Sequence, residues 1–169
     1  MGFSKKIQLI STIDVYDLER DLPETDRALL KQAKRALDAA YAPYSNFYVG
    51  AAVLLDNGQV VIGNNQENAS YPSGLCAERV AIYQAGARFP GIALKAIAIA
   101  CRTDSYVIKE PLSPCGACRQ ALAEYENLYS KIRIIMKGET GKIYVAESIE
   151  SLLPLMFTAK QVKKQANHL

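Results

Sequence analysis

The sequence predicts an α/β fold, a three-layer α/β/α sandwich built on a mixed five-stranded sheet. Two strand-like apolar runs flank Asp56-Asn57-Gly58, which is the pattern of an antiparallel hairpin. Further on, segments with helical spacing of apolar residues alternate with strand-like runs, and such crossovers place helices on the faces of a sheet. The chain has 169 residues, 50% of them apolar, which is enough for one core without disulfides.

The first half of the chain is expected to contain an arm, a helix and the hairpin. Residues 1–23 form the arm, with an extended or strand-like stretch between Ile7 and Val15. Leu22-Pro23 begins a helix whose apolar residues recur at helical spacing up to Tyr41, and Pro43 ends it. After this helix come two hairpin strands and a polar loop, at residues 47–55, 59–63 and 64–74.

The second half alternates helices and strands. The predicted elements, in order, are a helix at 75–87, a strand at 94–101, a loop at 103–114, a helix at 115–127, and strands at 131–137 and 142–146. Ser148 is expected to cap a short helix that ends at Leu153-Pro154. Lys160–Leu169 is expected to be a solvated end of the chain.

Charge and hydropathy exclude several classes of partner. Lys plus Arg number 20 and Asp plus Glu number 17, and a net charge of +3 is too small to mark a nucleic-acid or membrane surface. The longest strongly apolar run, Ile92–Cys101, is short and contains Lys95, so it cannot span a bilayer. The N-terminus lacks the apolar region of a signal peptide. We therefore expect a cytoplasmic protein that binds neither nucleic acid nor membrane.

Four cysteines and one histidine limit the possible chemistry. The histidine, His168, is next to the last residue, which excludes a His-based triad or a His-rich metal site. Cys115-Gly-Ala-Cys118 follows Pro114 and opens a predicted helix, so both sulfurs lie on one face of the first turn. A C-x-x-C pair also fits a redox pair, half of a structural zinc site, or two core cysteines. Its position late in the chain weakens the redox interpretation.

The run Cys76-Ala77-Glu78-Arg79 starts another predicted helix. Positions i and i+2 point about 200° apart on an α-helix, so Cys76 and Glu78 can converge only if Cys76 lies at the very first turn. Three thiolates leave one position open, as in a catalytic zinc site. Such a site carries a net negative charge, which Arg79 and two helix N-termini could offset. Cys101 ends an apolar strand and is expected in the core, although as a fourth thiolate it would close a structural site.

These residues match the zinc-deaminase signature, H-x-E followed by P-C-x-x-C, with cysteine in place of histidine. The chain resembles the small homotetrameric cytidine deaminases that act on free nucleosides. The resemblance covers residues 25–157 and rests on further segments that are similar to motifs of that family. These segments are Tyr41–Ala52, Asn65–Ser70, Pro114–Glu124 and Leu152–Phe157.

The resemblance implies a cytidine deaminase-like fold and an enzyme of pyrimidine salvage. The implied reaction is zinc-dependent hydrolytic deamination of cytidine and deoxycytidine to uridine and deoxyuridine, with release of ammonia. Cys76, Cys115 and Cys118 would bind Zn²⁺, and Glu78 would transfer protons between the water, the pyrimidine ring and the leaving amine. The motifs do not rank cytidine against deoxycytidine.

The resemblance also implies how the substrate is held. Asn65 and Glu67 would hydrogen-bond the ribose hydroxyls, and Phe47 would pack near the base. The backbone N–H of Ala77 would contact the pyrimidine carbonyl, as a free donor at a helix N-terminus can. Phe157 would reach the active site of a neighbouring subunit in a homotetramer.

The expected organisation is an N-terminal arm at 1–23, a cytidine deaminase domain at 24–158 and a C-terminal tail at 159–169. The arm lies outside the usual family core. The loop Ser70–Leu75 also departs from the Tyr-Gly-Leu-Thr of some relatives, although its length is kept. The contacts that this loop makes to substrate therefore do not follow from the resemblance.

Three other functions remain open at this stage. The chain could be another small-molecule deaminase, such as a blasticidin-S deaminase, which substrate profiling would distinguish. A polynucleotide deaminase would need an electropositive track with stacking aromatic residues, and the lysines here are scattered among acids. A non-enzymatic zinc-stabilised interaction domain would have no use for Glu78.

Overall fold

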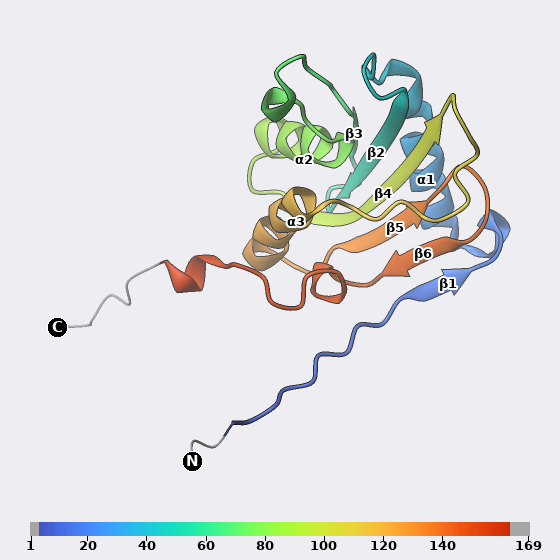
Figure 1. The fold of residues 1–169 in the computed structure, drawn as a ribbon. Coiled ribbons are helices and arrows are strands. Elements are labelled where there is room, and N and C mark those ends of the chain that lie inside the picture. The colour runs from blue at the N-terminus through green and yellow to red at the C-terminus, as the bar shows by residue number, and fades with distance from the viewer. Residues whose placement is uncertain (1–3, 163–169) are drawn as a thin grey trace.

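Figure 1 shows the computed structural model of the chain, which describes residues 4–162. A mixed sheet of six strands forms the middle layer, in the order β1-β6-β5-β4-β2-β3. In chain order the strands are β1 (Asp14–Tyr16), β2 (Phe47–Leu55), β3 (Val60–Asn64), β4 (Leu94–Thr103), β5 (Arg133–Lys137) and β6 (Ile143–Ala146).

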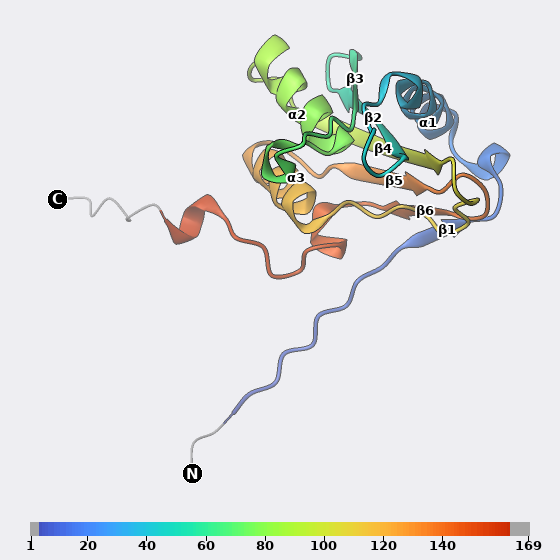
Figure 2. The same ribbon diagram turned by 45° about the horizontal axis from the view of Figure 1, so that its top comes forward.

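Three α-helices cover the two faces of the sheet (Figure 2). They are α1 (Glu24–Ala36), α2 (Ala77–Arg88) and α3 (Gly116–Leu128). Ile97 and Ile134 belong to the core cluster beneath α2 and α3, whereas their neighbours Ala98 and Ile135 belong to the cluster beneath α1. This alternation follows from the two-residue period of a strand. The predicted α/β/α sandwich is confirmed.

The sheet is mixed because some neighbouring strands are joined by hairpins, whereas β4 and β5 are joined by a crossover through a helix. The predicted hairpin is present as an antiparallel β2–β3 pair, with Gly58 at φ 81° in the turn. Strand β4 pairs antiparallel with β2, and it pairs parallel with β5, which the chain reaches through α3. Strand β6 returns antiparallel to β5.

The predicted number of five strands was wrong by one. Asp14–Tyr16, from the end of the arm, pairs antiparallel with β6 and adds a strand at the sheet edge. Strand β6 is only four residues long, so it offers no partner to the rest of the apolar stretch predicted between Ile7 and Val15. The described part of the arm before β1 extends away from the body of the fold (Figure 1), and the side chains of Ile7 and Ile10 are exposed, whereas Ile13 packs against the core.

Several predicted boundaries shift. The first helix ends at Ala36 and continues as a 3-10 turn to Ala39, because Tyr41 forms a β-bridge with Gln66 instead of extending the helix. The last predicted helix is a single 3-10 turn, Ile149–Ser151.

The predicted cap of that turn is confirmed, since the Ser148 Oγ accepts a hydrogen bond from the Glu150 N–H at 3.1 Å. A further 3-10 turn, Ala159–Gln161, occupies the start of the predicted tail, and His168 lies outside the described residues. Between residues 4 and 162, no helix combines the length and apolar character needed to cross a membrane.

Helix α2 lies directly on the edge hairpin because of one glycine. A Cβ added to Gly63 of β3 would lie 2.5 Å from the Ala81 nitrogen and 2.6 Å from the Ala77 carbonyl oxygen. Only a residue without a side chain permits this approach. The start of α2 is thereby fixed beside the sheet, next to α3.

Candidate metal centre and active site

The candidate metal ligands occupy the first turns of two helices. Cys76 is the N-cap residue of α2 and Cys115 is the N-cap residue of α3, and both have extended backbone angles. Cys118 is the third residue of α3, within its first turn. The position of Cys76 at the very first turn meets the condition set by its spacing from Glu78. Neither N-cap side chain accepts a backbone hydrogen bond, so neither sulfur is occupied in capping its helix.

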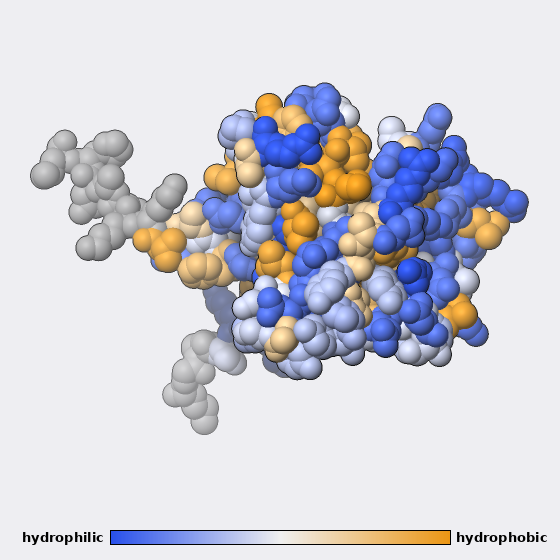
Figure 3. Space-filling view, turned by 90° about the horizontal axis from the view of Figure 1, so that it is seen from above, coloured by the Kyte–Doolittle hydropathy of each residue, from blue (hydrophilic) through white to orange (hydrophobic). Residues whose placement is uncertain are grey.

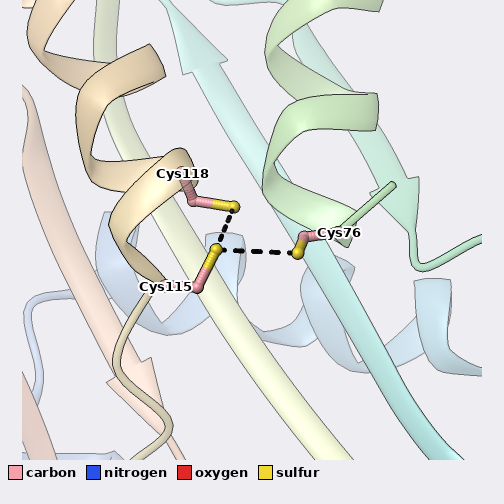
Figure 4. Close-up of side chains that lie close together, drawn as sticks. All are labelled: Cys76, Cys115 and Cys118. Atoms are coloured by element: carbon pink, nitrogen blue, oxygen red, sulfur yellow. Dashed lines mark hydrogen bonds between the residues drawn. The ribbon is translucent and has the colours of Figure 1, made fainter. Parts of the chain in front are cut away.

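The three sulfurs point toward one another (Figure 4). The Sγ atoms of Cys76 and Cys115 are 3.7 Å apart, and those of Cys115 and Cys118 are 3.4 Å apart. A tetrahedral site with Zn–S bonds of about 2.3 Å separates its sulfurs by about 3.8 Å. The three sulfurs therefore fit a zinc ion. Among residues 4–162, no other three Cys, His, Asp or Glu side chains place ligand atoms within 4.8 Å of one another.

The charges around the sulfurs also fit a cation. The neighbouring Cys118 thiol, together with Arg79, lowers the pKa of Cys76 to about 5. The proximity of Cys76 and burial raise the pKa of Cys118. One thiolate thus forms readily in the metal-free chain at the expense of its neighbour, because adjacent thiolates repel each other. A divalent cation removes that conflict and permits all three to ionise.

Arg79 lies beside the sulfur cluster, with its Nη2 atom 4.0 Å from the Cys76 Sγ. Its Nε atom is buried and, within the described residues, is the only buried side-chain nitrogen or oxygen without a hydrogen-bond partner. An unpaired buried donor is rare in folded proteins. The arrangement therefore places an incompletely satisfied cation next to a group of thiolates.

Glu78 lies next to the sulfurs and is almost completely buried, with 4% of its surface exposed. Burial raises the pKa of its carboxyl above the ordinary value. It nonetheless lines a cavity of about 640 Å³, together with Cys76 and Cys115. A carboxyl group that is shielded from bulk water but open to a cavity can exchange protons with a bound molecule.

The cavity brings together most of the predicted substrate-binding residues. Phe47, Asn65 and Glu67 line it, and the aromatic rings of Tyr44 and Tyr71 lie edge to face there with their centres 6.1 Å apart. The loops that carry these residues lie at the top of Figure 1 and face the viewer in Figure 3, where apolar surface gathers between polar side chains.

The Asn65 side chain extends the hydrogen bonding between β2 and β3. Its Oδ1 atom accepts from the Val49 N–H at 2.8 Å, and its Nδ2 atom donates to the Phe47 carbonyl at 2.8 Å. These bonds fix the side chain at the cavity wall. Each polar atom keeps one further hydrogen-bonding position, because an amide offers two acceptor lone pairs and two donor hydrogens.

Glu67 is held by the loop that precedes β2. Its carboxylate accepts hydrogen bonds from the Tyr44 N–H at 2.9 Å, from the Ser45 N–H at 3.3 Å and from the Ser45 hydroxyl. Burial opposes ionisation, but these three donors outweigh it and lower the pKa of Glu67. A carboxylate has about four lone-pair sites, so one remains for a ligand hydroxyl.

Two predicted substrate contacts do not line the cavity of the single chain. Ala77 is buried at the first position of α2, where the helix leaves its N–H without an intrahelical acceptor. Phe157 is 58% exposed, and its carbonyl accepts a hydrogen bond from the Gln120 Nε2 atom at 2.8 Å. Cys101 is buried in the core as predicted and is not part of the sulfur cluster.

The sequence did not single out Ser45 or Arg119, which the structure places around the site. Ser45 is one of the donors to Glu67, and Arg119 bonds to the chain just before Cys115. Both lie within segments that carried the family resemblance, and Arg119 directly follows a candidate ligand. Their position within these segments is the only sequence feature that could have pointed to them, and it does not say what either residue does.

A protein-family model matches most of the chain. The family described as "Cytidine and deoxycytidylate deaminase zinc-binding region" matches residues 23–134. A cytidine deaminase from Halalkalibacterium halodurans is 42% identical over 138 residues, which is 79% of this chain and 95% of the relative. Matches of this extent leave mainly the two ends of the chain outside the shared region.

Solved structures show the same relationship. The crystal structure of cytidine deaminase from Burkholderia pseudomallei is 40% identical, with a TM-score of 0.69, over 80% of this chain and 100% of that chain. That of cytidine deaminase from Mycobacterium tuberculosis is 35% identical, with a TM-score of 0.61, over 77% of this chain and 94% of that chain. The family match at residues 23–134 includes the three cysteines of the sulfur cluster and the residues that line the cavity.

Proposed function

Because this chain belongs to the family of cytidine and deoxycytidylate deaminases with a zinc-binding region, we propose that it is a zinc-dependent cytidine deaminase. The proposed reaction converts cytidine and deoxycytidine, with water, to uridine and deoxyuridine and releases ammonia, as in pyrimidine salvage. The observation that carries the proposal is the placement of three cysteine sulfurs and Glu78 at one cavity.

Cys76, Cys115 and Cys118 are the residues that would hold the zinc ion. When bound, zinc supplies Lewis acidity, which lowers the pKa of water from its bulk value to about 7. Three thiolates reduce that acidity, since they leave the site with a net negative charge. Arg79, whose Nη2 atom is 4.0 Å from the Cys76 Sγ, is the proposed charge-balancing residue.

Glu78 is the proposed proton carrier. It takes a proton from the attacking water and delivers it to N3 of the pyrimidine, which makes C4 electrophilic. After the water oxygen has added at C4, Glu78 takes the second proton from that oxygen and passes it to the exocyclic amine, which leaves as ammonia while the C4 carbonyl forms. One carboxyl group acts in turn as base and acid, so no second titratable residue is required.

The cavity suits a nucleoside better than a nucleotide. Among the described residues that line it, none is Lys or Arg, whereas Glu67 and Glu78 both contribute carboxyl groups. A phosphate group requires cationic or multiple N–H donors for binding. The remaining hydrogen-bonding positions of Asn65 and Glu67 are proposed to bind ribose hydroxyls, while Phe47 packs near the base and the Ala77 N–H binds the pyrimidine carbonyl.

The proposed enzyme is a cytoplasmic homotetramer whose catalytic domain spans residues 24–158. The exposed side chains of Leu155 and Phe157 on the C-terminal segment support an assembly, because large exposed apolar side chains favour burial against a partner. In this assembly Phe157 would reach the active site of a neighbouring subunit. Light scattering on the purified protein measures the subunit number, and a monomeric mass for the active enzyme would contradict this part of the proposal.

One experiment tests the reaction and its substrate class. The purified protein is incubated with cytidine, deoxycytidine and CMP, while cytosine absorbance and ammonia are followed and zinc per chain is measured on the same sample. We expect turnover of both nucleosides, much slower turnover of CMP and stoichiometric zinc. A zinc-loaded, folded protein that deaminates neither nucleoside would refute the proposal, and turnover of blasticidin S alone would redirect it.

A further inference from the structure

Arg119 connects two segments that are distant in the sequence. Its Nε atom donates to the Pro114 carbonyl at 2.8 Å, and its Nη2 atom donates to the Ser113 Oγ at 2.9 Å. Its Nη1 atom donates to the Leu152 carbonyl at 2.7 Å. All three bonds have good lengths, and their acceptors lie around one half-buried side chain. The planar, fork-shaped guanidinium can serve three acceptors at once.

Arg119 makes hydrogen bonds to the carbonyl group just before Cys115 and to the carbonyl group of Cys115 itself, so the backbone is held on both sides of this residue. The side chain binds the carbonyl of Pro114, which precedes Cys115, and the backbone N–H binds the carbonyl of Cys115 itself at 2.9 Å. Cys115 has no capping hydrogen bond of its own. Ser, Thr, Asp and Asn are the preferred capping residues of helices, and a cysteine that ligates a metal at that position cannot provide such a cap. Arg119, a residue within α3, instead holds the backbone at the start of the helix.

The third hydrogen bond of the Arg119 side chain, to the Leu152 carbonyl, links α3 to the C-terminal segment. Leu152 begins the stretch that leads to Phe157, and the next side chain along α3, Gln120, donates to the Phe157 carbonyl at 2.8 Å. Neighbouring residues of α3 therefore fasten both ends of the 152–157 segment to the helix that carries two of the candidate ligands.

We propose that Arg119 is a positioning residue of the metal centre, which acts through the Ser113–Cys115 turn and does not touch the substrate. It keeps the Cys115 sulfur within reach of Cys76 and Cys118, and it sets the turn in register with the 152–157 segment. The inference rests on the proposed function, because it concerns the zinc ion of that same site. It assigns to Arg119 a part in holding the metal in addition to any part in holding the fold.

The test measures how firmly zinc is held. Arg119→Met removes all three side-chain bonds at similar size, Arg119→Lys retains a charge but not the fork, and Ser113→Ala removes one acceptor. Arg35→Met is the matched control, because Arg35 is exposed on α1, on the opposite face of the sheet. For each protein the thermal melt, the rate of zinc transfer to a chelator and the visible spectrum of the Co²⁺-substituted form are recorded.

Partners that orient metal ligands typically change metal affinity by about 10- to 100-fold when removed. We expect zinc loss from Arg119→Met to accelerate within that range, Arg119→Lys to be intermediate, and the Co²⁺ spectrum to change in both. Arg35→Met should match the wild type. A lower melting temperature alone, with unchanged zinc release and spectrum, would show a purely structural role and overturn the proposal.

Two outcomes separate this inference from the proposed function. If the wild-type protein retains no zinc, the proposed function fails and the inference fails with it. If the wild type holds zinc and deaminates cytidine but the folded Arg119→Met variant keeps zinc equally well, only the inference is overturned. Should Arg119→Met not fold, Ser113→Ala decides the question, and an unchanged rate of zinc release in that variant overturns the inference.

Discussion

The four cysteines occupy two regions of the molecule with opposite chemical character. Cys76, Cys115 and Cys118 lie in the first turns of α2 and α3, whereas Cys101 lies within β4 and is 2% exposed. The neighbouring Cys118 thiol helps lower the pKa of Cys76 to about 5. Burial, with Glu139 nearby, raises the pKa of Cys101 to about 11. The thiols of Cys76 and Cys101 thus differ in acidity because their surroundings differ.

The difference follows from the backbone around each thiol. A helix N-terminus presents unpaired N–H groups and the positive end of the helix dipole, which favour a thiolate. A strand interior has its N–H groups paired within the sheet, and burial there disfavours the charged thiolate. The Cys101 thiol accordingly remains a donor, and it lies 3.8 Å from the Lys137 carbonyl oxygen. A cysteine becomes a candidate ligand through its place in the secondary structure.

The largest expected effect comes from removing one thiol of the sulfur cluster. Cys76→Ala should retain less than stoichiometric zinc and lose deaminase activity to background, because two sulfurs cannot hold the ion in place. Zinc per chain and cytidine turnover are measured on the same samples, with Cys101→Ala as the matched control. Stoichiometric zinc and a normal rate in Cys76→Ala would remove this residue from the ligand set and break the comparison.

Glu78→Gln separates metal binding from proton transfer within the first region. The variant should keep its zinc, since all three sulfurs remain, but lose turnover by about 10²- to 10⁴-fold, the usual contribution of a general acid–base group. Zinc content and kcat are the measurements. Full activity would exclude Glu78 from the mechanism, whereas loss of zinc would show that it supports the ligands.

Alkylation of the thiols compares the two regions directly. At pH 7 a thiol with a pKa near 11 is ionised to only about one part in 10⁴, and the thiolate is the reactive form. In metal-free protein, a thiol reagent followed by mass spectrometry should therefore modify Cys76 well before Cys101. Zinc-loaded protein should be protected at the cluster. Modification of Cys101 first would contradict the contrast between the two environments.

The smallest effect is expected from Cys101→Ala. The substitution removes one buried sulfur from the core, at a cost of about 1 kcal/mol in the free energy of unfolding. For a chain of this size that corresponds to a fall of about 2–4 °C in melting temperature. Zinc content and cytidine turnover should remain at the wild-type level. A loss of zinc in this variant would give Cys101 a role that its burial in the core does not indicate.

Most of the fold was predictable because its signals are local. The hairpin around Asn57-Gly58 and the cap at Ser148 each depend on residues next to one another in the sequence. The sixth strand was not predictable in this way, since Asp14–Tyr16 needs the free edge of β6 for its pairing. The end of α1 likewise depends on a bridge between Tyr41 and Gln66.

The residues of the site likewise fall into those that the sequence could predict and those that it could not. The candidate ligands and Glu78 could be predicted because their residue types and spacing are specific to zinc-dependent deamination. The contacts of Arg119 could not, because two of its acceptors are backbone carbonyl oxygens and one of them lies 33 residues away, at Leu152. Every residue has a backbone carbonyl, so the sequence does not show which of them accepts a hydrogen bond.

The sequence by itself determined the chemistry: which side chains can ligate, which can carry a proton, and that the thiols begin helices. Only the tertiary structure decided that Cys76 and Cys115, 39 residues apart, bring their sulfurs to 3.7 Å. The physical reason is that the start of a helix follows from neighbouring residues, whereas the separation of two helices follows from how each packs on the sheet. The close approach of α2 to β3 at Gly63 is one such packing contact.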